Sequence, residues 1–473
     1  MKILIATKNL GKLKEYQALF SELDLEYVTL NDLAPCAEPI ESGLTLFENA
    51  LIKAFYYYKQ FGLPVISDDT GLFVDGLDGA PGVNTARYSG LGDQGNRALL
   101  LKNLEGKSRN ACFKTALVFY DGTNIITSLG VLKGEIAKCE LGEEGFGYDK
   151  VFYVPKLTKT LAQIPLAQKN LLSHRFKAIN NLYFKLQFYF NKANIIDYIK
   201  SLCYKVFNIE LSPRITKLSG GMSNDTYLVT YPNSSYTVRI PGLSAELFVD
   251  RWKEQEALDL VQNKDSFLQY LYFDSELGVK ISPYLAEQKG PLEYDSLNLV
   301  LHQLHELPKF KEDYLPFKRL EYYERLCQIL GDRISTNYYD LKKILLKYQD
   351  MLISRPMVSC HNDCQLSNYI ASNAKYTLID FEFVGNNDYL FDYACFGNND
   401  LAIGKALLQT ELKRSISEEE NQIIELWYSL QALSWYLVAT FKDETGASLS
   451  LGLDFKQIAS MFLDKAANLL KQY

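Results

Sequence analysis

The spacing of apolar residues predicts alternating strands and helices in the first part of the chain. Short apolar runs, such as KILIAT at 2–7 and PVISDD at 64–69, have the length and composition of buried strands. Amphipathic stretches, such as LKEYQALFSEL at 13–23 and NRALLLKNL at 96–104, repeat their apolar residues with a helical period. Alternation of this kind indicates an α/β domain.

A β-rich stretch and a helical stretch complete this first half. Residues 111–137 contain two or three apolar runs around the turn sequence DGTN, which predicts a hairpin. Residues 165–190 keep a helical spacing until the polar stretch NKAN at 191–194. We therefore place a boundary near 188–194 and expect a first domain over residues 1–190.

The order of elements changes beyond this boundary. Residues 195–206 predict a helix and residues 215–242 predict strands around a turn, after which most of the chain is helical. Strands followed by helices are typical of an α+β domain with a small sheet and a larger helical lobe. A chain of 473 residues has room for two such cores, so we expect a second domain over residues 195–473.

Composition argues against two classes of partner. The net charge is −7 and the calculated pI is about 5.4, whereas nucleic acid or an anionic membrane surface requires a basic field. The N-terminal segment soon turns polar, and no run of about 18 apolar residues occurs. The eight cysteines are scattered without paired spacing, as is typical of reduced thiols. We therefore expect a cytoplasmic protein without nucleic-acid or membrane partners.

The N-terminal stretch TKNLGK at 7–12 predicts phosphate binding. It follows a strand and precedes a helix, so its backbone N–H groups can face a phosphate together with Lys8 and Lys12. A solvated helix cap is the alternative interpretation.

Carboxylates downstream predict a metal site beside those phosphates. Asp68 and Asp69 end an apolar strand, and Glu38 and Glu41 precede them in the chain. These side chains supply the hard oxygen ligands that Mg²⁺ prefers. One aspartate can instead activate water, and a Ser-Asp-Asp turn that satisfies its own backbone is the alternative.

Several motifs in register resemble the Ham1 family of inosine triphosphate pyrophosphatases over residues 1–187. They are TKNLGK at 7–12, ESGLTLFENALIKA at 41–54, SDDTG at 67–71, GAPGVNTARYSG at 79–90, GFGYD at 145–149 and QKNLLSHR at 168–175. The resemblance implies an α/β fold with a mixed sheet and a homodimer formed through this domain. It also implies Mg²⁺-dependent hydrolysis of ITP, dITP or XTP to a monophosphate and pyrophosphate.

The resemblance further implies roles for individual residues. Asp69 would be the catalytic carboxylate, and Glu41 or Asp69 would help to bind Mg²⁺. The residues implied to hold the substrate are Thr7, Lys8, Asn9, Gly11, Lys12, Thr70, Phe146, Gly147, Tyr148, Asp149, Lys169, His174 and Arg175. Arg175 has only donors, so it satisfies a purine 6-keto oxygen but leaves the 6-amino group of adenine unpaired. Thr70 in place of serine and Gln163 in place of an acid depart from the family pattern without removing a group that the reaction needs.

A second set of motifs predicts phosphoryl transfer. The stretch HNDCQLSN at 361–368 has the spacing H-x-D-x-x-x-x-N of a kinase catalytic loop. In this pattern the aspartate, here Asp363, accepts the proton of the substrate hydroxyl, and the asparagine, here Asn368, binds a metal ion. Asp380 then ends the β-branched run in LIDFEF, where it can coordinate the Mg²⁺ that bridges the ATP phosphates.

The expected upstream parts of an ATP site are also present. Arg239 stands where a kinase strand carries its phosphate-pairing cation, and Glu254 or Glu256 can pair with it from the next helix. A small-residue turn between strands can close over phosphates through Gly220, Gly221, Ser223 and Asn224. An ordinary turn and surface charges are the alternative interpretation of these positions.

Residues 195–473 resemble the choline and ethanolamine kinase family, especially the LicA-type choline kinases, within the aminoglycoside phosphotransferase-like fold. The resemblance rests on the catalytic loop, on the sequence DFE that begins at Asp380, and on Arg239 in place of lysine. It implies an α+β, protein-kinase-like bilobal fold. It also implies transfer of the ATP γ-phosphate to a small alcohol by Asp363, with Mg²⁺ on Asn368 and Asp380.

The acceptor alcohol is less determined. Aromatic residues and two aspartates near the C-terminus can form a cage for the quaternary ammonium of choline, although their helical spacing is also typical of core residues. They are Tyr389, Phe391, Tyr393, Trp427, Trp435, Tyr436, Asp388 and Asp392. Choline is favoured, and ethanolamine, thiamine or an aminoglycoside are the alternatives.

Two further alternatives compete with an active kinase. The second half can be a non-catalytic, nucleotide-binding module that regulates the first, against which the intact catalytic-loop and metal-binding residues argue. The stretch CHNDC at 360–364 can be a Cys/His metal site, although no second ligand cluster occurs. Our interpretation is a bifunctional fusion enzyme.

Overall fold

The chain forms two compact units. The computed structural model describes residues 2–8, 13, 16, 25–218, 224–288, 290–331, 333–372 and 375–473, with only the backbone at 449 and 450. One unit comprises residues 1–198 and 243–247, and the other comprises residues 199–242 and 248–473. Across the described ranges, no helix is both long and apolar enough to cross a membrane.

The first unit is built on a mixed sheet, which confirms the expected architecture. Among described residues the strand order is β2-β1-β3-β5-β6-β7-β8, with β4 paired to β3. Strand β1 is parallel to β2 and β3, and the other pairs are antiparallel. The strands are β1 (Lys2–Ile5), β2 (Glu26–Thr29), β3 (Val65–Val74), β4 (Pro81–Gly82), β5 (Asn110–Tyr120), β6 (Ile125–Ile136), β7 (Phe152–Val154) and β8 (Lys159–Thr160). The hairpin predicted around DGTN is β5–β6.

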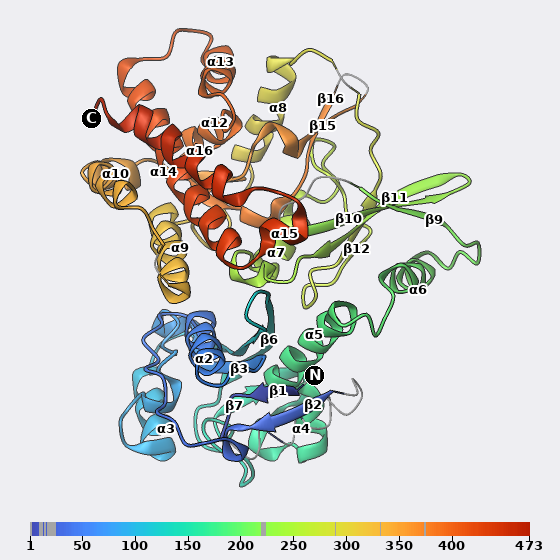
Figure 1. Cartoon of the computed structure of the whole chain (residues 1–473), viewed down its shortest axis with the longest axis vertical. Coiled ribbons are helices and arrows are strands. Elements are labelled where there is room, and N and C mark those ends of the chain that lie inside the picture. Colours follow the sequence, from blue (N-terminus) through green and yellow to red (C-terminus); the bar gives the residue numbers. More distant parts are fainter. Residues whose placement is uncertain are drawn as a thin grey trace. The chain divides into compact units, whose positions relative to one another are not determined.

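Helices cover the sheet of the first unit (Figure 1). Those described are α2 (Leu46–Phe61), α3 (Gly92–Asn103), α4 (Leu166–Leu172) and α5 (His174–Tyr189). Helix α5 packs Leu182 into a core with Phe119 of β5. Helix α2 lies against β3 and β5; its N-terminus is capped by a reciprocal pair of hydrogen bonds between Thr45 and Glu48, and Gly62 at φ 64° ends it.

Two helix predictions in this unit have different outcomes. The helix predicted over 165–190 is in fact two helices, because Ser173 adopts an extended backbone and its Oγ accepts a hydrogen bond from Phe176 N, which starts α5. The helix predicted over 13–23 falls mostly outside the described residues. Within this range the structure describes Leu13 and Tyr16, and both are helical.

The second unit has a small antiparallel sheet and two short ribbons, as expected of a kinase-like fold. The five strands have the order β12-β13-β11-β10-β9 among the described residues, and the ribbons are β14–β17 and β15–β16. The strands are β9 (Arg214–Lys217), β10 (Asn224–Tyr231), β11 (Ser234–Pro241), β12 (Tyr272–Phe273), β13 (Lys280–Pro283), β14 (Val358–Cys360), β15 (Tyr369–Ser372), β16 (Lys375–Leu378) and β17 (Gly385–Asn387). The register of β11 and β13 places Arg239 opposite Lys280.

Helices make up most of the rest of this unit. They are α6 (Ile195–Phe207), which contains the division between the units, α7 (Arg251–Val261), α8 (Tyr294–His305), α9 (Pro316–Leu330), α10 (Thr336–Leu346), α11 (Gln349–Ile353), α12 (Tyr389–Phe396), α13 (Leu401–Leu412), α14 (Glu418–Glu444), α15 (Ala447–Leu451) and α16 (Phe455–Leu470). Helix α14 packs along α16, α9 and α12, and its pairing with α16 is visible in red in Figure 1. The central part of α14 is almost entirely buried, which explains its largely apolar sequence.

Candidate active sites

Polar side chains gather where β3 faces α2 in the first unit. Asp69 accepts hydrogen bonds from Asn49 Nδ2 (3.0 Å) and from Thr70 N (3.0 Å). Lys53 Nζ lies 3.9 Å from Asp69 Oδ1 and 3.2 Å from Glu41 Oε1. Burial raises the pKa of Asp69, and the charge of Lys53 and the Asn49 hydrogen bond oppose this shift. The structure therefore brings the predicted acids, Asp69 and Glu41, to one lysine.

The predicted phosphate loop is described only in part. Thr7 is buried directly after β1, and Lys8 Nζ lies 2.8 Å from Glu38 Oε1 at the surface. The other predicted residues of this loop, Asn9, Gly11 and Lys12, lie outside the described residues. The phosphate-binding role of the loop stays a prediction.

The predicted base-binding residues form a small network on the loop before β7. Asp149 Oδ2 accepts hydrogen bonds from Lys169 Nζ (2.5 Å) and from Phe146 N (3.0 Å). Lys169 Nζ also lies 5.4 Å from the centroid of the Phe146 ring, whose residue is 65% exposed. Gly147 N donates to Asp93 Oδ2 (2.8 Å). An exposed aromatic face beside a lysine and an aspartate can stack on a base and bind its polar edge.

The remaining predicted residues differ in exposure and partners. Tyr148 is buried and its hydroxyl donates to Thr85 O (2.9 Å), so it anchors the loop. The His174 ring stacks on Phe113 with centroids 4.7 Å apart. Arg175, in the first turn of α5, is 8% exposed. The break at Ser173 thus separates Lys169 on α4 from His174 and Arg175 on α5.

Gly145 offers a specific test of the base-binding network. Its φ is +85°, and a Cβ added there would lie 2.2 Å from Asp149 Oδ2. Gly145→Ala should therefore displace Asp149 and its partner Lys169, and raise the KM for ITP by roughly tenfold in a pyrophosphate-release assay.

A matched substitution separates backbone strain from this displacement. Gly62 also has a positive φ of +64°, but an added Cβ would meet nothing within 4 Å. Gly62→Ala should leave the KM for ITP unchanged. Equal KM values in the two variants would contradict the assigned role of the loop.

In the second unit, the residues of the predicted catalytic loop come together directly after β14. Asn368 Nδ2 donates to Asp363 Oδ2 (3.0 Å) and to the Asp363 carbonyl (2.7 Å), and Gln365 Nε2 donates to Asp363 Oδ1 (3.3 Å). Burial raises the pKa of Asp363 well above its usual range, and the negative charge of Asp380 adds to this effect. A cation at Asp380 would relieve that repulsion.

The residue before the predicted catalytic aspartate fixes the loop. Asn362 has a φ of 62°, in the left-handed region that asparagine tolerates better than most residues. Its Nδ2 donates to the carbonyls of Cys360 (3.2 Å), Phe383 (3.1 Å) and Gly385 (3.1 Å), and its Oδ1 accepts from Asn387 (2.9 Å). These bonds compensate the unfavourable backbone and fix the direction of the aspartate that follows.

Arg239 lies in a buried network of charges at the wall of the cleft. It pairs with Glu254 of α7 and with Asp380, and lies 3.1 Å from Glu382. Lys280 Nζ lies 3.2 Å from Glu254, which has no exposed surface. Burial lowers the pKa of Lys280, and the nearby Arg239 lowers it further. Glu254 therefore holds two cations that the register of β11 and β13 places side by side.

The structure places the other predicted ATP-site residues differently. Glu256, the alternative partner for Arg239, instead lies 3.4 Å from Lys311 near the surface. Asn224 Nδ2 donates to Glu382 Oε1 (2.9 Å). The remaining predicted turn residues, Gly220, Gly221 and Ser223, lie outside the described residues.

The acids of this network fit a divalent cation. Oxygens of Glu254, Asp380 and Glu382 lie within 4.8 Å of one another. Of the three, Asp380 has the most exposed side chain, at 29%, and it faces the cleft together with Asn368. Carboxylate and amide oxygens are hard donors that suit such an ion.

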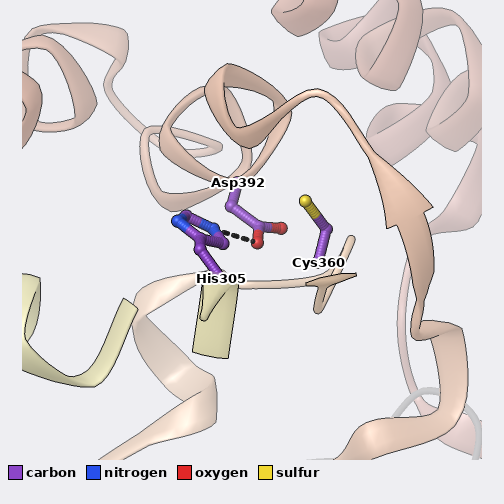
Figure 2. Close-up of side chains that lie close together, drawn as sticks. All are labelled: His305, Cys360 and Asp392. Carbon is purple, nitrogen blue, oxygen red and sulfur yellow. Dashed lines mark hydrogen bonds and ion pairs between the residues drawn. The ribbon is translucent and has the colours of Figure 1, made fainter. Parts of the chain in front are cut away.

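The Cys/His alternative for the stretch CHNDC is not supported. His361 Nε2 is bonded to Ile379 O (2.9 Å), and in the described part of the chain neither His361 nor Cys364 belongs to a group that can hold a metal. Cys360 does form such a group with His305 and Asp392 (Figure 2). These side chains have other partners: Cys360 Sγ lies 3.5 Å from Asn387 O, and Asp392 accepts hydrogen bonds from His361 N and Asn362 N.

Two cavities meet at Asp363. A cleft of about 600 Å³ extends from Arg239 and Lys280 on the sheet to Asn368 and Asp380 on the loops. A second pocket begins at Asp363, and its walls include the cation Lys442 and six aromatic residues, namely Phe248, Tyr314, Tyr323, Phe383, Phe391 and Trp435. A nucleotide in the first cavity and an alcohol in the second would both reach Asp363.

The aromatic pocket corrects the cage expected from the sequence. Of the expected aromatic residues, only Phe391 and Trp435 are among its walls. Trp427 is buried and donates instead to Asp388 Oδ2 (2.8 Å). Helical spacing predicted that these residues lie on helices but could not tell which side of α12 or α14 faces the pocket.

Some site residues were given no role from the sequence. Asn49 and Lys53 lie within the stretch ESGLTLFENALIKA at 41–54 and have the i, i+4 spacing of one helix face, a signal that could have linked them to Asp69. Lys280 has no local signal, because only the register of two strands places it beside Arg239.

Comparisons with known proteins match a family to each half of the chain. Residues 3–185 match the model of the Ham1 family, and residues 214–421 match that of the Phosphotransferase enzyme family. The dITP/XTP pyrophosphatase of Listeria monocytogenes serotype 4b is 43% identical over 189 residues, which cover 38% of this chain and 92% of the relative. That of Geobacillus kaustophilus is 43% identical over 187 residues, with the same coverage.

A solved structure resembles the second unit. It is the choline kinase LicA from Streptococcus pneumoniae, at 23% identity and a TM-score of 0.51, with 59% of this chain and 100% of that chain covered. At this identity the likeness establishes the fold. The chain therefore belongs to the Ham1 family through residues 3–185 and is a fusion of that domain with a phosphotransferase-family domain of the choline-kinase fold.

Proposed function

We propose that this chain is a bifunctional enzyme. Its first domain hydrolyses the purine nucleoside triphosphates ITP, dITP and XTP to the monophosphate and pyrophosphate. Its second domain transfers the γ-phosphate of ATP to a small alcohol, with choline as the first candidate. The domain limits we propose are residues 1–190 and 195–473.

The acid cluster at Asp69 supports the first activity. Asp69 accepts the proton of a water that attacks the α-phosphate, and Asn49 and Lys53 hold it in its ionised form. Mg²⁺, held by Glu41 and Asp69, would neutralise charge that develops on the phosphates. The 43% identity to dITP/XTP pyrophosphatases supports this substrate class.

Base selection is proposed to depend on Arg175. A guanidinium has only donors, so it pairs with the 6-keto oxygen of hypoxanthine or xanthine and opposes the 6-amino group of adenine. Arg175 is 8% exposed, and a buried donor left unpaired gives strong discrimination. Phe146 stacks on the base while Lys169 and Asp149 bind its edge or the sugar.

The meeting of two cavities at Asp363 supports the second activity. Arg239 and the adjacent Lys280 face the nucleotide phosphates, and Mg²⁺ on Asn368 and Asp380 would bridge them. Asp363 accepts the proton of the acceptor hydroxyl as it attacks the γ-phosphate. Because no bond to the protein forms, positioning and charge account for the rate.

The aromatic pocket has a volume of only about 50 Å³ and favours a small acceptor with a cationic apolar part. Aromatic faces bind a quaternary ammonium, which supports choline. The same walls accommodate ethanolamine less selectively, and thiamine or an aminoglycoside would need more room. A non-catalytic module is disfavoured, since Asp363, Asn368 and Asp380 are all in place.

A screen of alcohols tests the second activity. The full chain, with ATP labelled in the γ-phosphate and Mg²⁺, should phosphorylate choline at a rate at least tenfold above ethanolamine, thiamine and kanamycin. The measurement is transfer of label to the alcohol. If no alcohol accepts label while ATP still binds, the non-catalytic module becomes the better interpretation.

Localisation and oligomeric state are proposed from the composition and from the resemblance to the Ham1 family. We propose a cytoplasmic protein that forms a homodimer through its first domain. Light scattering of the purified chain should give twice the monomer mass of 54.0 kDa, and a monomer would contradict the dimer.

A further inference from the structure

A buried carboxylate supports the backbone of the catalytic loop. Asp392, on α12, has no exposed surface. Its Oδ2 accepts a hydrogen bond from His361 N (3.1 Å), and its Oδ1 accepts one from Asn362 N (2.8 Å). These two peptide groups directly precede Asp363, so Asp392 holds the segment that directs the proposed proton acceptor.

The third partner of this carboxylate comes from another element. His305 is the last residue of α8, and its Nε2 lies 3.0 Å from Asp392 Oδ2. Figure 2 shows the imidazole on one side of the carboxylate and the Cys360 thiol on the other. An ionised carboxylate only accepts hydrogen bonds, so Nε2 carries the hydrogen. No part of the proposed phosphoryl transfer assigns a role to His305.

We propose that His305 is a positioning residue for phosphoryl transfer, acting through Asp392 on the backbone that carries Asp363. The kinetic part of this inference rests on the proposed function of the second domain. The structural part, that His305 holds the loop amides through Asp392, does not.

The hydrogen-bond geometry explains why the histidine matters. Burial by itself would raise the pKa of Asp392, but the hydrogen bond and charge of His305 keep it below its usual range. Without His305, a buried carboxylate keeps fewer donors, which is unfavourable. If Asp392 then takes up a proton, its O–H opposes a loop N–H, two donors face each other, and the loop must move.

Small movements of this loop affect the rate more than binding. Proton transfer requires Asp363 within hydrogen-bond distance of the acceptor hydroxyl, and a displacement of about 1 Å can lower a rate by roughly a hundredfold. The groups proposed to bind nucleotide phosphates, such as Arg239 and Lys280, lie on the sheet. Among the described residues, they form no hydrogen bond or ion pair with His305 or Asp392. Loss of His305 should therefore lower kcat and spare the KM for ATP.

Two substitutions at His305 and one control test the inference on the full chain. His305→Leu keeps the size and removes the donor, whereas His305→Gln supplies an amide N–H. His302 lies one turn earlier on α8 with a side chain that is 56% exposed, so His302→Leu is the matched control. We expect His305→Leu to lower kcat by roughly 10- to 100-fold while the KM for ATP stays within about twofold of the wild-type value. His305→Gln should regain most of kcat. The control His302→Leu should match the wild type.

Hydrogen exchange measured by mass spectrometry gives a readout that needs no acceptor. A peptide covering residues 358–366 should exchange faster in His305→Leu than in the wild type, and at the wild-type rate in His305→Gln and His302→Leu. Unchanged exchange in His305→Leu would overturn the inference, and so would an unchanged kcat.

Other outcomes are equally decisive. A His305→Gln variant as slow as His305→Leu would mean that the donor is not what matters. One transition-metal ion bound per chain, and lost in Cys360→Ser, would make His305 a metal ligand and overturn its positioning role. If the wild-type chain phosphorylates no alcohol, the proposed function fails, and the exchange measurement alone decides the structural part.

Discussion

Asp69→Asn should lower pyrophosphate release from ITP by roughly 10²- to 10⁴-fold while ATP-dependent phosphorylation of the alcohol continues at the wild-type rate. The substitution keeps the shape of the side chain but removes both the proton acceptor and the negative charge beside Lys53. The measurement is release of pyrophosphate and of IMP, with kinase activity of the same sample as the check on folding.

A neighbouring aspartate provides the control. Asp75 lies just beyond the end of β3 and is exposed, so Asp75→Asn makes the same chemical change away from the acid cluster. It should leave both activities unchanged. If Asp69→Asn also silenced the kinase without unfolding the chain, two independent sites could not be maintained.

Asp363→Asn should have the reverse effect, with phosphoryl transfer lowered by roughly 10²- to 10⁴-fold and ITP hydrolysis intact. An amide cannot accept the hydroxyl proton. It would also turn an N–H group toward Asn368 or Gln365, which both donate to the carboxylate now, so one donor would lose its acceptor.

The structural cost of this change needs its own measurement. Thermal unfolding should show a small loss of stability in Asp363→Asn, because one buried hydrogen bond is worth about 1 kcal/mol. A variant that retained phosphoryl transfer would remove Asp363 from the mechanism and favour direct attack by an unassisted hydroxyl.

Contacts between site residues that are close together in the sequence could be predicted. Asp363 and Asn368 belong to one short loop, and the structure confirms that they are in contact. The hairpin β5–β6 and the mixed sheet were also predictable, because alternation and turn residues are local signals. The pairing of Asp149 with Lys169 was only partly predictable. The motifs predicted both residues but not the contact between them.

Features that depend on tertiary packing could not be predicted. The partner of Arg239 was ambiguous between two glutamates because residues two apart on a helix face different directions, and the sequence does not say which direction is inward. For the same reason the sequence left open which of the C-terminal aromatic residues line the pocket and which belong to the core. Short strands such as β13 were missed, since four residues show too little periodicity to identify.

The register of β11 and β13 has a consequence for how this domain can evolve. Glu254 is fully buried between Arg239 and Lys280 and is also paired with Arg251, so losing Glu254 removes the carboxylate that these buried cations share and leaves Lys280 without its ion-pair partner. A lineage that replaces Glu254 is therefore expected to replace a cation beside it as well. Positions 239, 254 and 280 should covary as a set across related sequences, including pairs of residues far apart along the chain.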